Sequence, residues 1–88
     1  TGYDVYNKKN QIITRVSKKD LITYIRFIEY NDKGKEKKIV WLNGYKNEAP
    51  KFQDAELYEY DYKNQLIKKT NLDKDGKIEH VQEYYHRL

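Results

Sequence analysis

The heptapeptide Tyr60-Asp61-Tyr62-Lys63-Asn64-Gln65-Leu66 recurs with the same chemistry three more times in this chain of 88 residues. Each copy has a large side chain first, Asn or Asp second, and Asn or Gly fifth. The other copies are Tyr6-Asn7-Lys8-Lys9-Asn10-Gln11-Ile12, Tyr30-Asn31-Asp32-Lys33-Gly34-Lys35-Glu36 and Leu72-Asp73-Lys74-Asp75-Gly76-Lys77-Ile78. Because Asn and Gly tolerate positive φ, the fifth position signals a turn. Turns between alternating segments predict hairpins, and their repetition predicts a β-meander.

The spacing of these turns predicts a single all-β domain over residues 1–88, an antiparallel meander of about six or seven strands. Such a meander forms either a small barrel or a single sheet. A polar turn is expected at Ser17-Lys18-Lys19-Asp20, and a longer connection at about 43–53, which holds an Asn-Gly pair and the only proline. The expected strands are 3–7, 11–17, 21–30, 36–43, 54–62, 65–71 and 77–85.

A helix over 54–69 is the alternative to two of these strands. Leu57, Tyr60, Asn64 and Ile67 have helical spacing, and Asp54 stands where a helix cap is expected. Asn64 interrupts the apolar stripe, and the alternation of tyrosines in this segment favours a strand. The sequence therefore favours strands over 54–71.

The composition predicts a folded chain with a thin hydrophobic core. Hydrophobic residues make up 38% of the chain and charged residues 36%, while ten tyrosines argue against disorder. Of the 18 basic residues only three are arginines, and acidic residues are interspersed among them. This mixture argues against nucleic-acid recognition, because arginine is the side chain that supplies bidentate phosphate and base contacts. No apolar run is long enough for a membrane span.

The segment Tyr58-Glu59-Tyr60-Asp61-Tyr62-Lys63-Asn64-Gln65-Leu66 resembles the YD repeat of Rhs and wall-associated bacterial surface proteins. That repeat reads Tyr-x-Tyr-Asp-x-x-Gly-Arg-Leu, and here Asn64 replaces the Gly and Gln65 the Arg. Residues 3–12 are a looser copy, and residues 70–88 resemble a following unit. The resemblance implies a tyrosine-rich β-strand repeat, commonly extracellular, that binds or displays and does not catalyse. MORN-type hairpin repeats are a competing assignment.

No motif in the chain predicts catalysis, so we expect a protein that is not an enzyme, with no cofactor and no metal. Asn71 to Gln82 has the oxygen-rich spacing of an EF-hand loop, but Gln82 stands where the bidentate carboxylate belongs. We therefore interpret Asp73-Lys74-Asp75-Gly76 as a hairpin turn. His80 and His86 are expected to be surface side chains, and Ser17 has no histidine near it in the sequence.

The predicted binding residues are the aromatic side chains around the expected long connection: Trp41, Tyr45, Phe52, Tyr58, Tyr60 and Tyr62. Aromatic side chains carry much of the binding energy at protein surfaces. The leading hypothesis is a bacterial secreted or cell-surface binding or display module that engages a protein or glycan partner. The alternative is a small inhibitor-type protein, an immunity protein or effector, that blocks a single protein partner. A basic nucleic-acid binder ranks third, and self-association through open sheet edges is expected to be possible.

Overall fold

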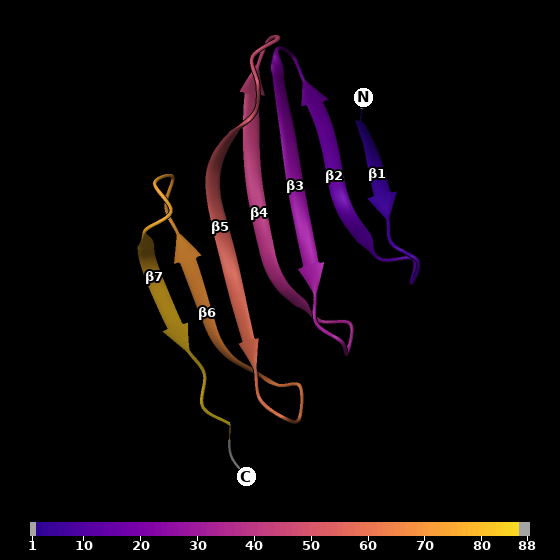
Figure 1. Ribbon diagram of the computed structural model, residues 1–88. Coiled ribbons are helices and arrows are strands. Elements are labelled where there is room, and N and C mark those ends of the chain that lie inside the picture. The colour runs from indigo at the N-terminus through magenta and orange to yellow at the C-terminus, as the bar shows by residue number, and fades with distance from the viewer. Residues whose placement is uncertain (1, 87–88) are drawn as a thin grey trace.

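The computed structural model describes residues 2–86 as one antiparallel sheet, whose seven strands lie side by side in chain order (Figure 1). All-β architecture and the meander topology are therefore confirmed, and the single sheet is the form adopted. The strands are β1 (Gly2–Tyr6), β2 (Ile12–Lys19), β3 (Ile22–Tyr30), β4 (Glu36–Tyr45), β5 (Lys51–Tyr60), β6 (Leu66–Leu72) and β7 (Ile78–Glu83). The helix considered over 54–69 is wrong, since β5 and β6 occupy that segment.

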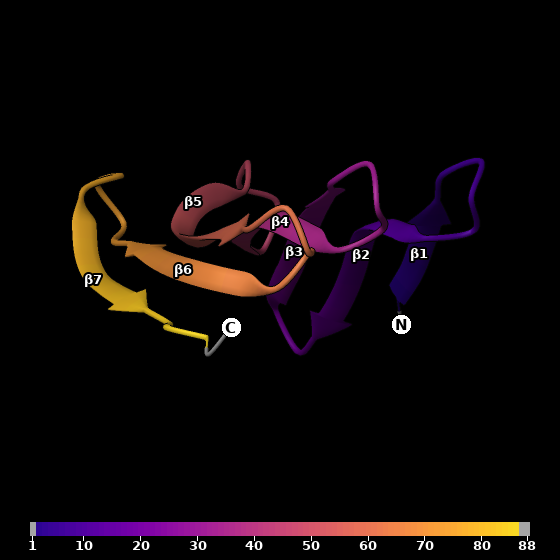
Figure 2. The same cartoon turned by 90° about the horizontal axis from the view of Figure 1, so that it is seen from below.

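The sheet is one layer thick. Its extents are 51 × 32 × 15 Å, and each strand contacts only the strands next to it in the sheet, so no second layer packs on either face within residues 2–86. Figure 2 shows this layer twisting along its length, with β1 and β7 at its two ends. Both faces of the sheet are consequently open over most of their area.

The four copies of the heptapeptide form four turns of one geometry. In each, the Oδ1 atom of the second residue accepts hydrogen bonds from two main-chain N–H groups, two and four residues further on, at 2.8–3.0 Å. The fifth residue has positive φ in every copy, from 63° to 86°, as the Asn/Gly pattern predicts; these residues are Asn10, Gly34, Asn64 and Gly76. Asp73 uses its carboxylate in this way, which confirms the turn interpretation.

The first and seventh residues of every copy pair across the hairpin, just past a register shift in the ladder. The pairs are Tyr6 with Ile12, Tyr30 with Glu36, Tyr60 with Leu66 and Leu72 with Ile78. Three of these turns lie at one end of the strands, whereas the turn between β6 and β7 lies at the opposite end (Figure 1). The repeat therefore fixes both the hairpin length and the position of the bulge.

The connection expected over about 43–53 is shorter in the structure. Asn43 and Gly44 continue β4 by pairing with Tyr24 and Thr23, and β5 begins at Lys51, which leaves residues 46–50 as the connection. The Asn-Gly pair suggested a turn, but the ladder on both sides holds it in the strand. The polar turn expected at residues 17–20 is also displaced. β2 runs to Lys19, and the turn between β2 and β3 is Asp20–Leu21, with Asp20 at φ 57°.

The small core is divided between the two faces. Residues opposite each other in the ladder share a face, and the partners of Trp41 are Arg26 and Asp54. We call their face the Trp41 face, and the other, which carries Phe27 and Val40, the Val40 face. The most buried apolar residues are Ile28 and Ile39 on the Trp41 face, and Val16 and Ala55 on the Val40 face.

Candidate functional site

A row of side chains crosses five strands on the Trp41 face. Directly opposite one another, in order from β1 to β5, are Asp4, Arg15, Arg26, Trp41 and Asp54. The row therefore places both arginines of residues 2–86 on adjacent strands. It also places the single tryptophan between an arginine and an aspartate.

The charged side chains toward the β1 end of this row form an ion pair, whereas those on either side of Trp41 do not within residues 2–86. Arg15 makes a bidentate ion pair with Asp4, through Nε at 2.9 Å and Nη2 at 3.2 Å. This hydrogen bonding lowers the pKa of Asp4 below 3.8. Arg26 and Asp54 have no ion pair within the part of the chain that the structure describes. The Nε atom of Arg26 is buried and has no hydrogen-bond partner there.

Two shallow hollows lie on either side of Trp41. One, of about 260 Å³, is lined by residues of β2, β3 and β4, namely Arg15, Ser17, Tyr24, Ile25, Arg26 and Trp41. The other, of about 450 Å³, reaches across β5 to β6 and is lined by Tyr24, Trp41, Asn43, Gln53, Asp54, Glu56 and Asn71. Tyr24 and Trp41 belong to both, so an aromatic ridge separates a basic hollow from one lined by amides and carboxylates.

A second group of contacts borders this site on β5 and β6. The Nζ atom of Lys69 lies 2.5 Å from a carboxylate oxygen of Glu56 and 5.7 Å from the centre of the Tyr58 ring. Burial, with a further contribution from Glu56, raises the pKa of Tyr58 well above its usual value of 10.0. Glu56 is thus neutralised by Lys69, so that among residues 2–86 Asp54 is the carboxylate beside Trp41 without an ion pair.

The structure brings some of the predicted binding residues together and separates others. Trp41, Tyr45, Tyr58 and Tyr60 are on the Trp41 face. Phe52 pairs with Leu42 and so lies on the Val40 face, because the bulge at Gln53 shifts the register by one residue. Tyr62 is in a turn at the edge of the sheet, with 80% of its surface exposed.

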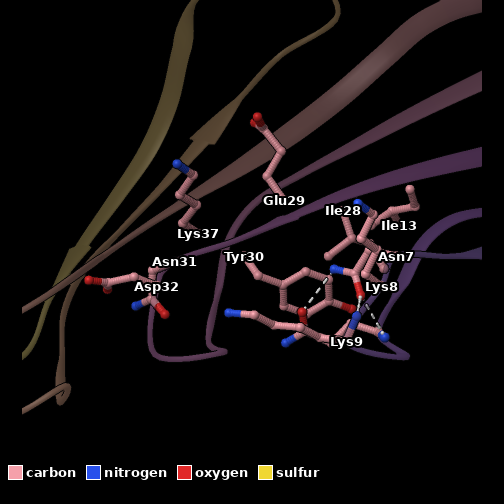
Figure 3. Close-up of a pocket in the computed structure, with 11 residues that line it drawn as sticks. Asn7, Lys8, Lys9, Ile13, Ile28, Glu29, Tyr30, Asn31, Asp32 and Lys37 are labelled. Carbon is pink, nitrogen blue, oxygen red and sulfur yellow. Dashed lines mark hydrogen bonds between the residues drawn. The ribbon is translucent and has the colours of Figure 1, made fainter.

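Another hollow, of about 700 Å³, lies between the turns that follow β1 and β3. Figure 3 shows Tyr30 lying toward Asn7 and Lys9, while Glu29 and Lys37 extend away from that group. The Asn7 side chain is used within its own turn, where it accepts from the main chain of Lys9 and Gln11 and donates to the Gln11 side chain. Because the polar atoms of the Asn7 side chain are already hydrogen-bonded within the turn, the two hollows beside Trp41 are the better candidate for recognition.

The residues that sequence reasoning missed are Arg15, Tyr24, Arg26 and Asp54. The position of the turn between β2 and β3 would have pointed to the two arginines, because the two-residue turn at Asp20–Leu21 determines which residues of these strands are opposite each other. Neither histidine lines the two hollows. His80 of β7 is opposite Asn71 of β6 on the Trp41 face, and the Nε2 atom of His86 is 2.6 Å from the Leu66 carbonyl oxygen.

Within residues 2–86, no three His, Asp or Glu side chains are grouped so that they could hold a metal ion. The same residues include no helix long and apolar enough to cross a membrane. Comparison of the chain with protein-family models, curated proteins and solved structures finds no match.

Proposed function

We propose that this chain is a non-catalytic β-repeat module of a bacterial secreted or cell-surface protein, which binds a protein or glycan partner through its Trp41 face. The observation that carries the proposal is the aromatic ridge of the exposed Tyr24 and the half-buried Trp41, which lies between a hollow lined by arginines and one lined by amides and carboxylates. In a sheet with so few buried residues, a tryptophan is expected to serve the core. Here Trp41 is half-buried and borders two open hollows on a face with no covering layer among residues 2–86.

The size and chemistry of this face support a binding role. The sheet measures 51 × 32 Å, which exceeds the roughly 800 Å² that each partner contributes to a standard protein interface. Tryptophan, tyrosine and arginine are the residues that most often dominate binding energy at interfaces. All three are present in the Trp41 row or next to it.

The repeated turns support a module that belongs to a display scaffold. Their four copies share one hydrogen-bond pattern, as expected of a repeat that resembles the YD family. A scaffold of identical hairpins holds a recognition face at a fixed position with little core. We place the module outside the cell on the strength of that resemblance.

A matched pair of substitutions tests the proposal. The chain is screened on a glycan array and against a panel of purified bacterial surface proteins, and each hit is measured with Trp41→Ala and with Phe27→Ala. Phe27 is 44% exposed and lies on the Val40 face, so it controls for the loss of an exposed aromatic ring. We expect Trp41→Ala to weaken binding at least tenfold and Phe27→Ala to leave it unchanged. The reverse order of effects would refute the assignment of the face.

The dimensions of the Trp41 face also favour a second function, that of an inhibitor-type protein that blocks one protein partner. A flat face of this size covers a single standard interface without any other domain. Sedimentation equilibrium separates the two functions. A tight one-to-one complex supports the inhibitor, and weak binding that strengthens when the module is presented in several copies supports the display module.

A further inference from the structure

Two arginines lie opposite each other on adjacent strands, and neighbouring carboxylates neutralise only one of them within residues 2–86. Arg15 and Arg26 are directly opposite each other on the Trp41 face, and like charges in that arrangement repel. Asp4 neutralises Arg15 from the far side, by hydrogen bonds to both of its carboxylate oxygens. One positive charge, that of Arg26, is therefore left between Arg15 and Trp41.

The Nε–H group of Arg26 also lacks a hydrogen-bond acceptor within residues 2–86. Its Nε atom is removed from solvent, and nothing within residues 2–86 accepts its hydrogen. A guanidinium is a planar fork whose N–H groups match a carboxylate in a bidentate arrangement. The hollow of about 260 Å³ beside Arg26, Arg15 and Tyr24 provides space for such a group.

The other side of Trp41 offers hydrogen-bonding groups of a different kind. Asn43, Gln53, Asp54 and Asn71 line the hollow of about 450 Å³, where they present amides and a free carboxylate. Amide and carboxylate side chains donate to and accept from hydroxyl groups. A ligand that spans both hollows therefore has an acid group at one end and hydroxyl groups at the other, with an apolar surface that rests on the aromatic ridge.

We propose that the Trp41 face binds an acidic sugar, with its carboxylate on Arg26 and Arg15, its ring against Trp41 and Tyr24, and its hydroxyls on Asp54 and Asn43. This rests on the proposed binding function and names its ligand class. A hydroxylated ring with one carboxylate brings an acceptor to the guanidinium group of Arg26 in one hollow and hydroxyl groups toward the amides and the carboxylate on the other side of the ridge. An acidic peptide fits less well, because the backbone groups in the middle of a sheet are already paired and offer an extended chain no ladder. A nucleic acid would bring its phosphates close to Asp54 and Glu56.

The site can be tested with small probes on the intact chain. Methyl β-D-glucuronide is compared with methyl β-D-glucoside, which lacks the acid, and with glutarate, which lacks the ring. The single tryptophan makes fluorescence a direct readout of Trp41, and the Nε–H resonance of Arg26 in a ¹⁵N spectrum reports on the guanidinium. We expect the glucuronide to bind at least tenfold more tightly than either control and to shift the Arg26 resonance.

Three substitutions separate the contribution of charge from that of shape. Arg26→Gln removes the charge and the fork, and Arg26→Lys keeps only the charge. Lys18→Gln removes one positive charge on the Val40 face, where Lys18 pairs with Thr23. Both Arg26 variants should bind the glucuronide at least tenfold more weakly, and Lys18→Gln should bind as the unmodified chain does. The amide spectrum of each variant shows whether the sheet is intact.

Several outcomes would overturn the proposal. Equal binding of glucuronide and glucoside would remove the role of the acid, and glucuronide binding that Arg26→Gln leaves unchanged would remove the role of the arginine. Competition by a poly-glutamate peptide at lower concentration than the sugar would assign the site to acidic proteins. If no sugar binds while Trp41→Ala still disrupts a protein complex, the acidic sugar is refuted as the ligand, and the proposal that the Trp41 face binds a partner is retained. If Trp41→Ala affects neither, the binding function fails as well.

Discussion

The Tyr30 hydroxyl donates a 2.7 Å hydrogen bond to the main-chain carbonyl oxygen of Ile12. The first residue of the heptapeptide at 30–36 is thereby bonded to the last residue of the heptapeptide at 6–12. Tyr60 repeats the contact with Glu36 at 2.5 Å. His86 takes the same place at the end of the chain, with Nε2 2.6 Å from the Leu66 carbonyl oxygen. The repeated tyrosine is therefore a link between neighbouring hairpins as well as a marker of each turn.

Removing one such link should lower stability measurably. Tyr60→Phe deletes the hydroxyl and leaves the Glu36 carbonyl without this donor, and we expect the free energy of unfolding to fall by about 1 kcal/mol. Tyr62→Phe is the control, since Tyr62 is 80% exposed, and it should change the free energy of unfolding by only about a few tenths of a kcal/mol. Urea titrations followed by circular dichroism measure both. Equal effects would show that the hydroxyl of Tyr60 adds nothing.

The side chain that accepts main-chain hydrogen bonds in each turn predicts a second pair of effects. Asp61 Oδ1 accepts from the N–H groups of Lys63 and Gln65, both at 2.9 Å. Asp61→Ala should therefore cost roughly 1–2 kcal/mol. Asp61→Asn should be nearly neutral, because Asn7 and Asn31 perform the same role in their turns. A loss in Asp61→Asn as large as in Asp61→Ala would mean that charge, and not the hydrogen bonds, stabilises the turn.

Backbone conformation at the fifth turn position predicts a third pair. Gly76 has φ 78°, and a Cβ atom built there meets nothing within 4 Å, so any cost of substitution is conformational. Gly76→Ala should lower the free energy of unfolding by about 1 kcal/mol. Gly76→Asn should cost clearly less, since Asn10 and Asn64 adopt this conformation in the chain itself. Thermal unfolding of the two variants compares them, and a more stable Ala variant would contradict the argument.

Alkaline pH should destabilise the sheet through three half-buried tyrosines. Burial is the main cause that raises the pKa values of Tyr30, Tyr58 and Tyr60 above 10.0 in the folded chain. A raised folded pKa gives a contribution that is complete below the unfolded pKa and is lost as pH rises through the folded pKa. Stability should thus be steady up to about pH 10 and fall above it. In Tyr58→Phe the fall should be less steep, as urea midpoints at each pH would show.

The free edge at β7 predicts self-association. All of β7 is exposed, including Ile78 at 68% and Val81 at 39%, and an open edge can pair with another chain. We expect the apparent mass in light scattering to rise with concentration, and Val81→Lys to suppress that rise. Phe27→Lys changes an exposed apolar residue in the interior of the sheet and should have less effect. Equal suppression by both would point to contact between faces.

The sequence allowed the turns and strands to be predicted because their signals are local. The Asn/Gly at the fifth position and the alternation in β3 and β5 depend on neighbouring residues only. The limits of β4 could not be predicted in this way. Gly44 lies in the strand because Thr23 pairs with it, and the chain folds back so closely that a Cβ there would lie 3.1 Å from the Glu48 carbonyl oxygen.

The candidate site was predictable only in part, for a related reason. Trp41 is noticeable as the single tryptophan, but its neighbours depend on register. Whether Arg26 is opposite Arg15 is decided by a turn of two residues, and the polar turn expected at residues 17–20 would have placed other pairs together. The bulge at Gln53 similarly decides that Asp54 is beside Trp41 while Phe52 is on the other face.

Every strand in the described chain packs only against the strands next to it in sequence. Such a molecule behaves as a linear series of coupled hairpins, with low contact order and no pair of distant segments that must meet first. Opening can begin at either end and stop at any turn. A hairpin gained or lost in evolution would lengthen or shorten the sheet without rebuilding the rest of it.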